Sequence, residues 1–125
     1  MLIGVPKEIK NHEYRIGLTP GGVNELVNHG HQVMVESNGG LAIGFDDEQY
    51  LRAGAEIVAA AQEIFARAEM IIKVKEPQPR ECAMLRPGQI LFTYLHLAPD
   101  PEQARLLLAS GATCIAYETV TENGL

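Results

Sequence analysis

Cysteine is scarce in this sequence, which contains only Cys82 and Cys114. Two cysteines are too few for a disulfide-rich scaffold, and their spacing is too wide for a zinc motif. We therefore expect two reduced thiols and a cytoplasmic protein. Nowhere do His, Cys and carboxylate residues follow one another at the spacing of metal ligands, so the sequence predicts no metal site.

Basic clusters and long hydrophobic runs are also missing. Sixteen acidic residues outnumber ten basic ones, which gives a net charge of −6 and disfavours a nucleic-acid-binding surface. The longest run of apolar residues is about five, whereas a membrane helix needs about 20. No charged and then apolar leader precedes the first predicted strand, so we expect neither export nor a membrane partner.

The sequence does have the composition of a soluble globular domain, in which strand and helix patterns alternate. Strands are predicted over residues 2–5, 32–36, 70–74, 89–94 and 112–117. Helices are predicted between Thr19-Pro20 and Gly30, from Asp46 or Asp47 to Arg52, over 56–68, and from Asp100-Pro101 to Gly111. Residues 56–58 are also compatible with a short strand that precedes the helix.

This alternation predicts an α/β fold with a doubly wound, mostly parallel sheet. Right-handed crossovers bring the carboxyl ends of parallel strands to one edge, so polar residues that follow different strands meet there. Arg15 follows the first strand, Lys75 follows the strand over 70–74, and His96 follows the strand over 89–94. We therefore expect these three residues to share one crevice.

Each of these candidates also has a plainer interpretation. Arg15 offers a fork of donors to a carboxylate or phosphate, or it is a surface residue paired with Glu8 or Glu13. Lys75 holds a carbonyl or carboxylate oxygen, or it is a solvated charge at a strand end. His96 exchanges a proton near neutral pH, or it is a satisfied core residue. Their convergence on one edge favours the functional interpretation.

The glycine-rich stretch over 38–44 does not have the Gly-x-Gly-x-x-Gly spacing of dinucleotide-binding loops. A backbone turn is the better explanation, and we predict no cofactor-binding residues in this chain. Near its end, Asn123-Gly124 is typical of a hairpin turn, with no following strand to pair. We therefore expect the chain to be part of a larger protein.

Five segments together resemble the N-terminal part of bacterial alanine dehydrogenases, which interconvert L-alanine and pyruvate with NAD. They are Ile3-Gly4-Val5-Pro6-Lys7-Glu8 through Arg15 and Thr19-Pro20; Gly44-Phe45-Asp46-Asp47; Ile72-Lys73-Val74-Lys75-Glu76-Pro77; Leu91-Phe92-Thr93-Tyr94-Leu95-His96-Leu97-Ala98; and Ala116-Tyr117-Glu118-Thr119-Val120. The first segment also resembles the alpha subunit of nicotinamide nucleotide transhydrogenase, whereas Tyr94-Leu95-His96 resembles the dehydrogenase.

The resemblance implies that residues 1–125 form an N-terminal substrate-binding (catalytic) domain. This domain would be Rossmann-like or flavodoxin-like, of the formate/glycerate dehydrogenase type, and incomplete. By the same resemblance, Arg15 binds the substrate carboxylate, Lys75 contacts the substrate and polarises its carbonyl, and His96 donates and accepts the proton.

The resemblance further implies that NAD is the cofactor and that a Rossmann domain absent from this chain binds it. The isolated chain is then expected to be inactive and to belong to a homo-oligomer, a hexamer by analogy. Two alternatives stay open. One is a transhydrogenase alpha-subunit-like fragment, which Tyr94-Leu95-His96 disfavours, and the other is a non-catalytic domain for assembly or small-acid binding.

Overall fold

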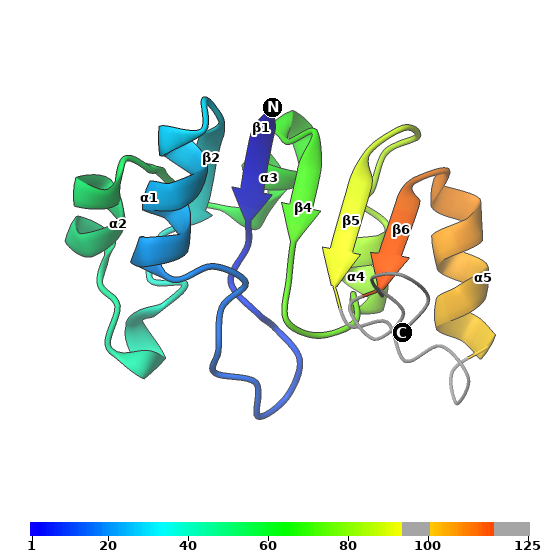
Figure 1. Cartoon of the computed structure of the whole chain (residues 1–125). Coiled ribbons are helices and arrows are strands. Elements are labelled where there is room, and N and C mark those ends of the chain that lie inside the picture. The colour runs from blue at the N-terminus through cyan, green and yellow to red at the C-terminus, as the bar shows by residue number, and fades with distance from the viewer. Residues whose placement is uncertain (94–100, 117–125) are drawn as a thin grey trace, which may run out of the picture.

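The computed structural model describes residues 1–93 and 101–116, in which strands and helices alternate along the chain (Figure 1). The strands are β1 (Leu2–Val5), β2 (Gln32–Glu36), β3 (Glu56–Val58), β4 (Met70–Ile72), β5 (Ile90–Thr93) and β6 (Thr113–Ala116). The α-helices are α1 (Pro20–Asn28), α2 (Asp47–Ala53), α3 (Ala61–Arg67), α4 (Pro79–Cys82) and α5 (Pro101–Ser110), and a 3-10 turn, η1, covers Leu41–Ile43.

The strands form one sheet in the order β3-β2-β1-β4-β5-β6. All neighbouring pairs are parallel; Ile3 lies opposite Val33, for example, and Ile71 lies opposite Leu91. The strand order reverses between β1 and β4, and such a switch point opens a crevice at the carboxyl ends of the two strands. The predicted parallel α/β sheet is thus confirmed, and the loops that follow β1 and β4 lie side by side at the switch point.

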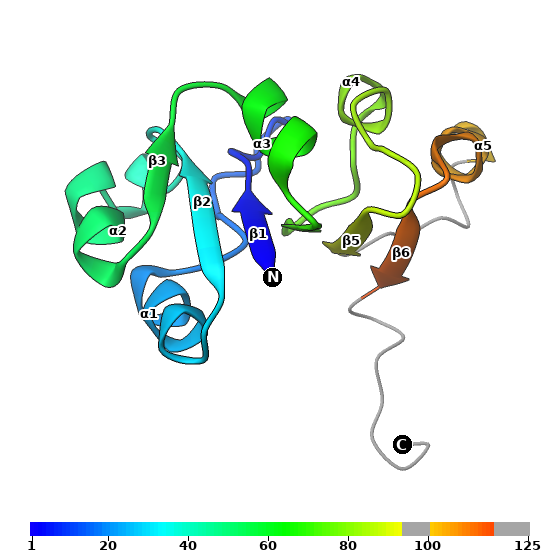
Figure 2. The same cartoon turned by 90° about the horizontal axis from the view of Figure 1, so that it is seen from above.

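Helices cover both faces of the sheet, as seen from above in Figure 2. Helices α1 and α2 lie on one face, and their buried residues Val23 and Tyr50 pack with Val33 and Val35 of β2. Helices α3, α4 and α5 lie on the other face, whose core includes Met34, Ile64, Phe65, Ile71, Cys82, Leu91 and Leu107. Because both faces are buried, the strands are almost continuously apolar. The doubly wound arrangement is therefore confirmed.

The predicted helix starts are confirmed by their caps. The Thr19 hydroxyl accepts the backbone N–H of Gly22 at 3.1 Å, and Pro20 occupies the first helical position of α1. Helix α2 begins with a capping box in which Asp46 and Gln49 each accept the other's backbone N–H. Of the two aspartates considered, Asp46 is the N-cap.

The helix predicted over 56–68 is wrong in its first part. Residues Glu56–Val58 form β3, which pairs in parallel with Met34–Glu36 of β2, and α3 begins only at Ala61. Ile57 and Val58 are β-branched and suit a strand, while the alanines that follow favour a helix. Pairing with β2 therefore decides in favour of the short-strand alternative.

The strand predicted over 70–74 ends earlier, at Ile72. The backbone N–H groups of Val74 and Lys75 donate to the carboxylate of Glu8 instead of continuing the sheet. Several other predictions, on Tyr94, His96, Asp100, Tyr117 and the Asn123-Gly124 turn, lie outside the described residues. The longest helix in the described part, α5, has 10 residues, and none there is long and apolar enough to cross a bilayer.

Candidate functional site

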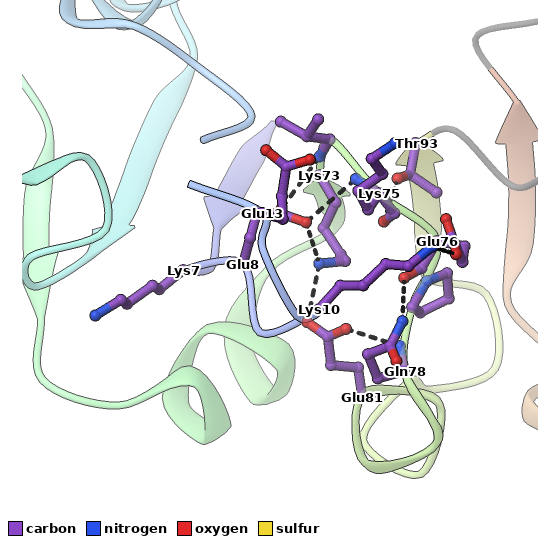
Figure 3. Close-up of polar contacts among 12 residues, drawn as sticks. Lys7, Glu8, Lys10, Glu13, Lys73, Lys75, Glu76, Gln78, Glu81 and Thr93 are labelled. Carbon is purple, nitrogen blue, oxygen red and sulfur yellow. Dashed lines mark hydrogen bonds and ion pairs between the residues drawn. The ribbon is translucent and has the colours of Figure 1, made fainter. Parts of the chain in front are cut away.

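The loop after β1 and the segment after β4 are held together by charged side chains at the switch point. The ammonium of Lys73 lies 2.9 Å from Oε1 of Glu8 and 3.0 Å from Oε2 of Glu81 (Figure 3). Nearer the surface, Lys10 of the first loop forms an ion pair with Glu76 of the second. These contacts join segments that are far apart in the sequence, since Glu8 and Lys73 are separated by 65 positions.

The cluster of Glu8, Lys73 and Glu81 is buried, with side chains only 1%, 1% and 2% exposed. Charges at such depth are tolerated when each is paired and hydrogen-bonded, and removing one partner of a buried pair costs about 3–5 kcal/mol. Glu8 meets this condition because Oε1 also accepts the N–H of Lys75 at 3.2 Å and Oε2 accepts that of Val74 at 3.1 Å. The cluster therefore fixes the backbone just after β4.

Glu81 completes the cluster from α4. Its Oε1 accepts the backbone N–H of Gln78 at 2.9 Å, within a capping box at the start of the helix. Burial raises the pKa of the Glu81 carboxyl, and the neighbouring Lys73 ammonium opposes this shift. Burial thus opposes the ionised form of Glu81, and the Lys73 ammonium favours it.

Arg15 lies in the loop after β1, where Glu13 binds it in bidentate fashion. Its Nε and Nη2 donate to the two carboxylate oxygens of Glu13, each at 3.0 Å, and its backbone N–H donates to Oε2 at 2.9 Å. This bond raises the pKa of the Arg15 guanidinium. The pairing with Glu13, which the sequence left open, is therefore present, and the Arg15 side chain remains 63% exposed.

Lys75 is half-buried at the exit of β4, and both its backbone polar groups are held by side chains. Its N–H donates to Glu8, and its carbonyl oxygen accepts the hydroxyl of Thr93, at the end of β5, at 2.7 Å. The Arg15 guanidinium, which hydrogen-bonds Glu13, holds the pKa of that carboxyl below its usual value, and the charge of Lys75 lowers this pKa further. Arg15 thus hydrogen-bonds the Glu13 carboxylate, and the charge of Lys75 acts on the same group.

His96, the third predicted residue, lies outside the described residues. The strand that precedes it in the sequence, β5, pairs with β4, which in turn pairs with β1. The candidates on the described part, Arg15 and Lys75, thus follow two adjacent strands, and Thr93 ends the next strand in the sheet.

A pocket of about 440 Å³ adjoins the loop after β1. Glu13 and Arg15 line it on the loop side, and Gly39 and Ala42 line it from the glycine-rich turn. The exposed guanidinium of Arg15 is therefore accessible to a small ligand in this pocket.

The glycine-rich stretch over 38–44 forms a closed backbone turn, as predicted. The N–H groups of Gly39, Leu41, Ile43, Gly44 and Phe45 donate to carbonyl oxygens of residues 36–41, and the N–H of Asn38 donates to Asp47. A phosphate-binding loop instead directs such donors at its ligand. These residues therefore do not fit the pyrophosphate of a dinucleotide.

The sequence interpretation missed the buried cluster. Lys73 was assigned to a buried strand without a partner, although a fully buried lysine almost always needs one. That rule was the signal available, because it calls for an acidic partner of Lys73. Which of the many acidic residues fills the role depends on the tertiary fold.

Comparison with known proteins identifies the family of this chain. Residues 4–124 match the family described as "Alanine dehydrogenase/PNT, N-terminal domain". The chain belongs to this family. The alanine dehydrogenase of Bacillus subtilis (strain 168) is 57% identical over 122 residues, which cover 98% of this chain and 32% of that protein. The resemblance found in the sequence is confirmed.

Solved structures related to the family show the same fold. An L-alanine dehydrogenase superposes with a TM-score of 0.94 and 50% identity, over 98% of this chain and 34% of that one. A transhydrogenase from Sinorhizobium meliloti superposes with a TM-score of 0.90 at 24% identity, over 98% of this chain and 36% of that one, which shows the fold alone. The chain spans about a third of the length of the relatives that it matches.

Proposed function

We propose that residues 1–125 are the substrate-binding domain of an NAD-dependent alanine dehydrogenase, which interconverts L-alanine and pyruvate. The observation that supports this proposal is that Arg15 and Lys75 follow β1 and β4, the two adjacent strands at the switch point, and that Glu8 of the Arg15 loop binds the backbone N–H of Lys75. Two cations at the carboxyl ends of parallel strands suit the carboxylate of a small acid. Relatives that are named alanine dehydrogenase, one of them 57% identical to this chain, support this substrate class.

In this proposal Arg15 binds the substrate carboxylate. Glu13 uses the Nε and Nη2 donors on one edge of the guanidinium. An arginine has five N–H donors, so the edge formed by Nη1 and Nη2 is left for a second carboxylate. The position of Arg15 on the wall of the 440 Å³ pocket gives pyruvate a route to that edge.

Lys75 and His96 are assigned to the other end of the substrate. The Lys75 ammonium is proposed to hold the carbonyl oxygen of pyruvate, which polarises the carbon that reacts. His96, outside the described residues, is proposed to give and take the proton, because an imidazole does so near neutral pH. Both assignments rest on the family resemblance and on the strand order of the sheet.

NAD would supply the hydride acceptor of this reaction when bound. Since the only glycine-rich turn in the described residues does not fit a dinucleotide, we assign NAD to another part of the protein. We further propose a domain of the formate/glycerate dehydrogenase type, a cytoplasmic location and a homo-oligomer, with a hexamer as the expected assembly.

Calorimetric titration of the chain with pyruvate tests the proposal. Methyl pyruvate, which lacks the ionised carboxylate, is the control ligand, and we expect heat of binding with pyruvate only. The absence of binding would contradict the proposal and favour a non-catalytic assembly domain. Binding of a nicotinamide dinucleotide in place of pyruvate would favour the transhydrogenase alternative.

A further inference from the structure

We propose that Glu8 and Thr93 are positioning residues for Lys75, which they hold in place by binding its backbone N–H and carbonyl groups. This inference rests on the proposed function, in which Lys75 contacts the substrate. Neither residue is placed in contact with the substrate, so both act through Lys75.

The backbone of Lys75 is held from two directions. Oε1 of Glu8, from the loop after β1, accepts its N–H at 3.2 Å. The hydroxyl of Thr93, from the end of β5, donates to its carbonyl oxygen at 2.7 Å. Lys75 follows β4, which lies between these two strands. A side chain from the loop after β1 and a side chain from the end of β5 thus fix a residue that belongs to no helix or strand.

The Glu8 carboxylate is itself fixed in orientation. It accepts the N–H of Val74 and of Lys75 and the ammonium of Lys73, while Glu81 holds that ammonium from the opposite side (Figure 3). With the side chain only 1% exposed, water has little access to compete for these bonds. Thr93 is likewise fully buried.

This arrangement couples the two halves of the proposed site. Glu8 and Arg15 lie on the same loop, and Glu8 binds the segment that carries Lys75. A substrate held at its carboxylate by Arg15 then meets Lys75 at a set distance. Small displacements of a substrate-binding group have large effects, about 10²-fold for a misplacement of about 1 Å.

The experiment compares Glu8→Gln with Glu81→Gln. Both variants remove a buried carboxylate from the same Lys73 ammonium, but Glu81 bonds to the N–H of Gln78 and not to that of Lys75. Their stabilities are measured by urea unfolding, and the pyruvate affinity of the folded protein by calorimetry. We expect about a ten- to hundredfold loss of affinity for Glu8→Gln and less than a threefold change for Glu81→Gln.

Thr93 supplies a second pair of variants. Thr93→Ser keeps the hydroxyl that binds the Lys75 carbonyl, whereas Thr93→Val keeps the shape and removes the hydroxyl. Serine is expected to retain wild-type affinity and valine to lower it about tenfold. If Glu8→Gln does not fold, the Thr93 variants test the positioning role by themselves. Equal pyruvate affinities of Thr93→Ser and Thr93→Val would then overturn the proposal.

Amide hydrogen exchange at Lys75, followed by NMR, separates this inference from the proposed function. We expect faster exchange in Glu8→Gln than in Glu81→Gln at equal global stability, whether or not pyruvate binds. A wild-type chain that does not bind pyruvate would refute the proposed function, while Lys75 exchange would still report on Glu8. Equal exchange in both variants, or equal loss of affinity, would overturn the positioning role.

Discussion

Glu13 binds the guanidinium of Arg15 with both carboxylate oxygens, at 3.0 Å from Nε and 3.0 Å from Nη2. The Glu13 side chain is only 5% exposed, whereas that of Arg15 is 63% exposed. A largely covered carboxylate thus pairs with a guanidinium that faces solvent. Such a bond restricts the rotamers of a long side chain before a ligand arrives, which reduces the entropic cost of binding.

Replacing Arg15 by methionine is expected to raise the pKa of Glu13 towards its ordinary value of 4.5. Because the folded-state pKa is depressed, the pair stabilises the fold above pH 4.5, and this contribution is lost as the pH falls through the folded-state pKa. Titration of the Glu13 side-chain carbon by NMR measures the shift. Arg52→Met is the control, since Arg52 pairs with Glu48 on α2, and an unchanged Glu13 pKa in Arg15→Met would contradict the pairing.

Replacing Arg15 by lysine is expected to weaken pyruvate binding about tenfold or more. An ammonium cannot offer two parallel donors, and one hydrogen bond to a charged group is worth about 1.5–3 kcal/mol. Calorimetry on the folded variant gives the affinity. Arg52→Lys, on an exposed helix face, keeps the same net charge and should bind as the wild type does. Equal affinities of Arg15→Lys and the wild type would instead favour a surface role for Arg15.

His96→Ala is expected to lower turnover in a complete enzyme that contains this chain. A positioned acid–base group supplies about 10²–10⁴-fold, and alanine removes it without filling its place. The turnover number for pyruvate reduction measures the effect, with His29→Ala, on the exposed end of α1, as the control. An unchanged turnover number would remove His96 from the mechanism.

The sequence was sufficient to predict the parts of the fold that local signals determine. Thr19-Pro20 and Asp46 mark helix starts because caps act within one turn, and alternation of elements predicts a parallel sheet. The segment over 56–58 was ambiguous because Ile57 and Val58 favour a strand by themselves, and only pairing with β2 shows that they form one.

The sequence allowed us to predict which loops meet at the site, but not which side chains pair there. The placement of Arg15 and Lys75 after neighbouring strands followed from topology. The bond from Glu8 to the Lys75 backbone did not, because it joins residues 67 positions apart through one carboxylate. Such pairing depends on distances of a few ångströms, which no local pattern encodes.

Gly4→Ala is expected to destabilise the fold by about 1–3 kcal/mol, as overpacking does. A Cβ at residue 4 would lie 2.5 Å from Cγ2 of Ile64 and 2.8 Å from Cβ of Ala68, so α3 would have to move away from β1. Gly21→Ala in α1 is the control: its nearest neighbour would be 3.8 Å away, and alanine there stabilises a helix by up to about 1 kcal/mol. Urea unfolding measures both, and equal stabilities would contradict the close packing of α3 on β1.

Glu81→Gln is expected to flatten the dependence of stability on pH. Burial raises the pKa of Glu81, so the folded state binds more protons than the unfolded state at pH values between 4.5 and the raised pKa. The stability that Glu81 contributes is therefore complete below pH 4.5 and is lost as the pH rises through the folded-state pKa. Glutamine does not titrate, so the difference in unfolding free energy between wild type and variant should change across this window.

Urea unfolding from about pH 4.5 to pH 8 measures this difference. Glu48 is the control position: its side chain is 74% exposed, so Glu48→Gln should leave the wild-type slope unchanged. A slope that persists in Glu81→Gln would show that another group carries it.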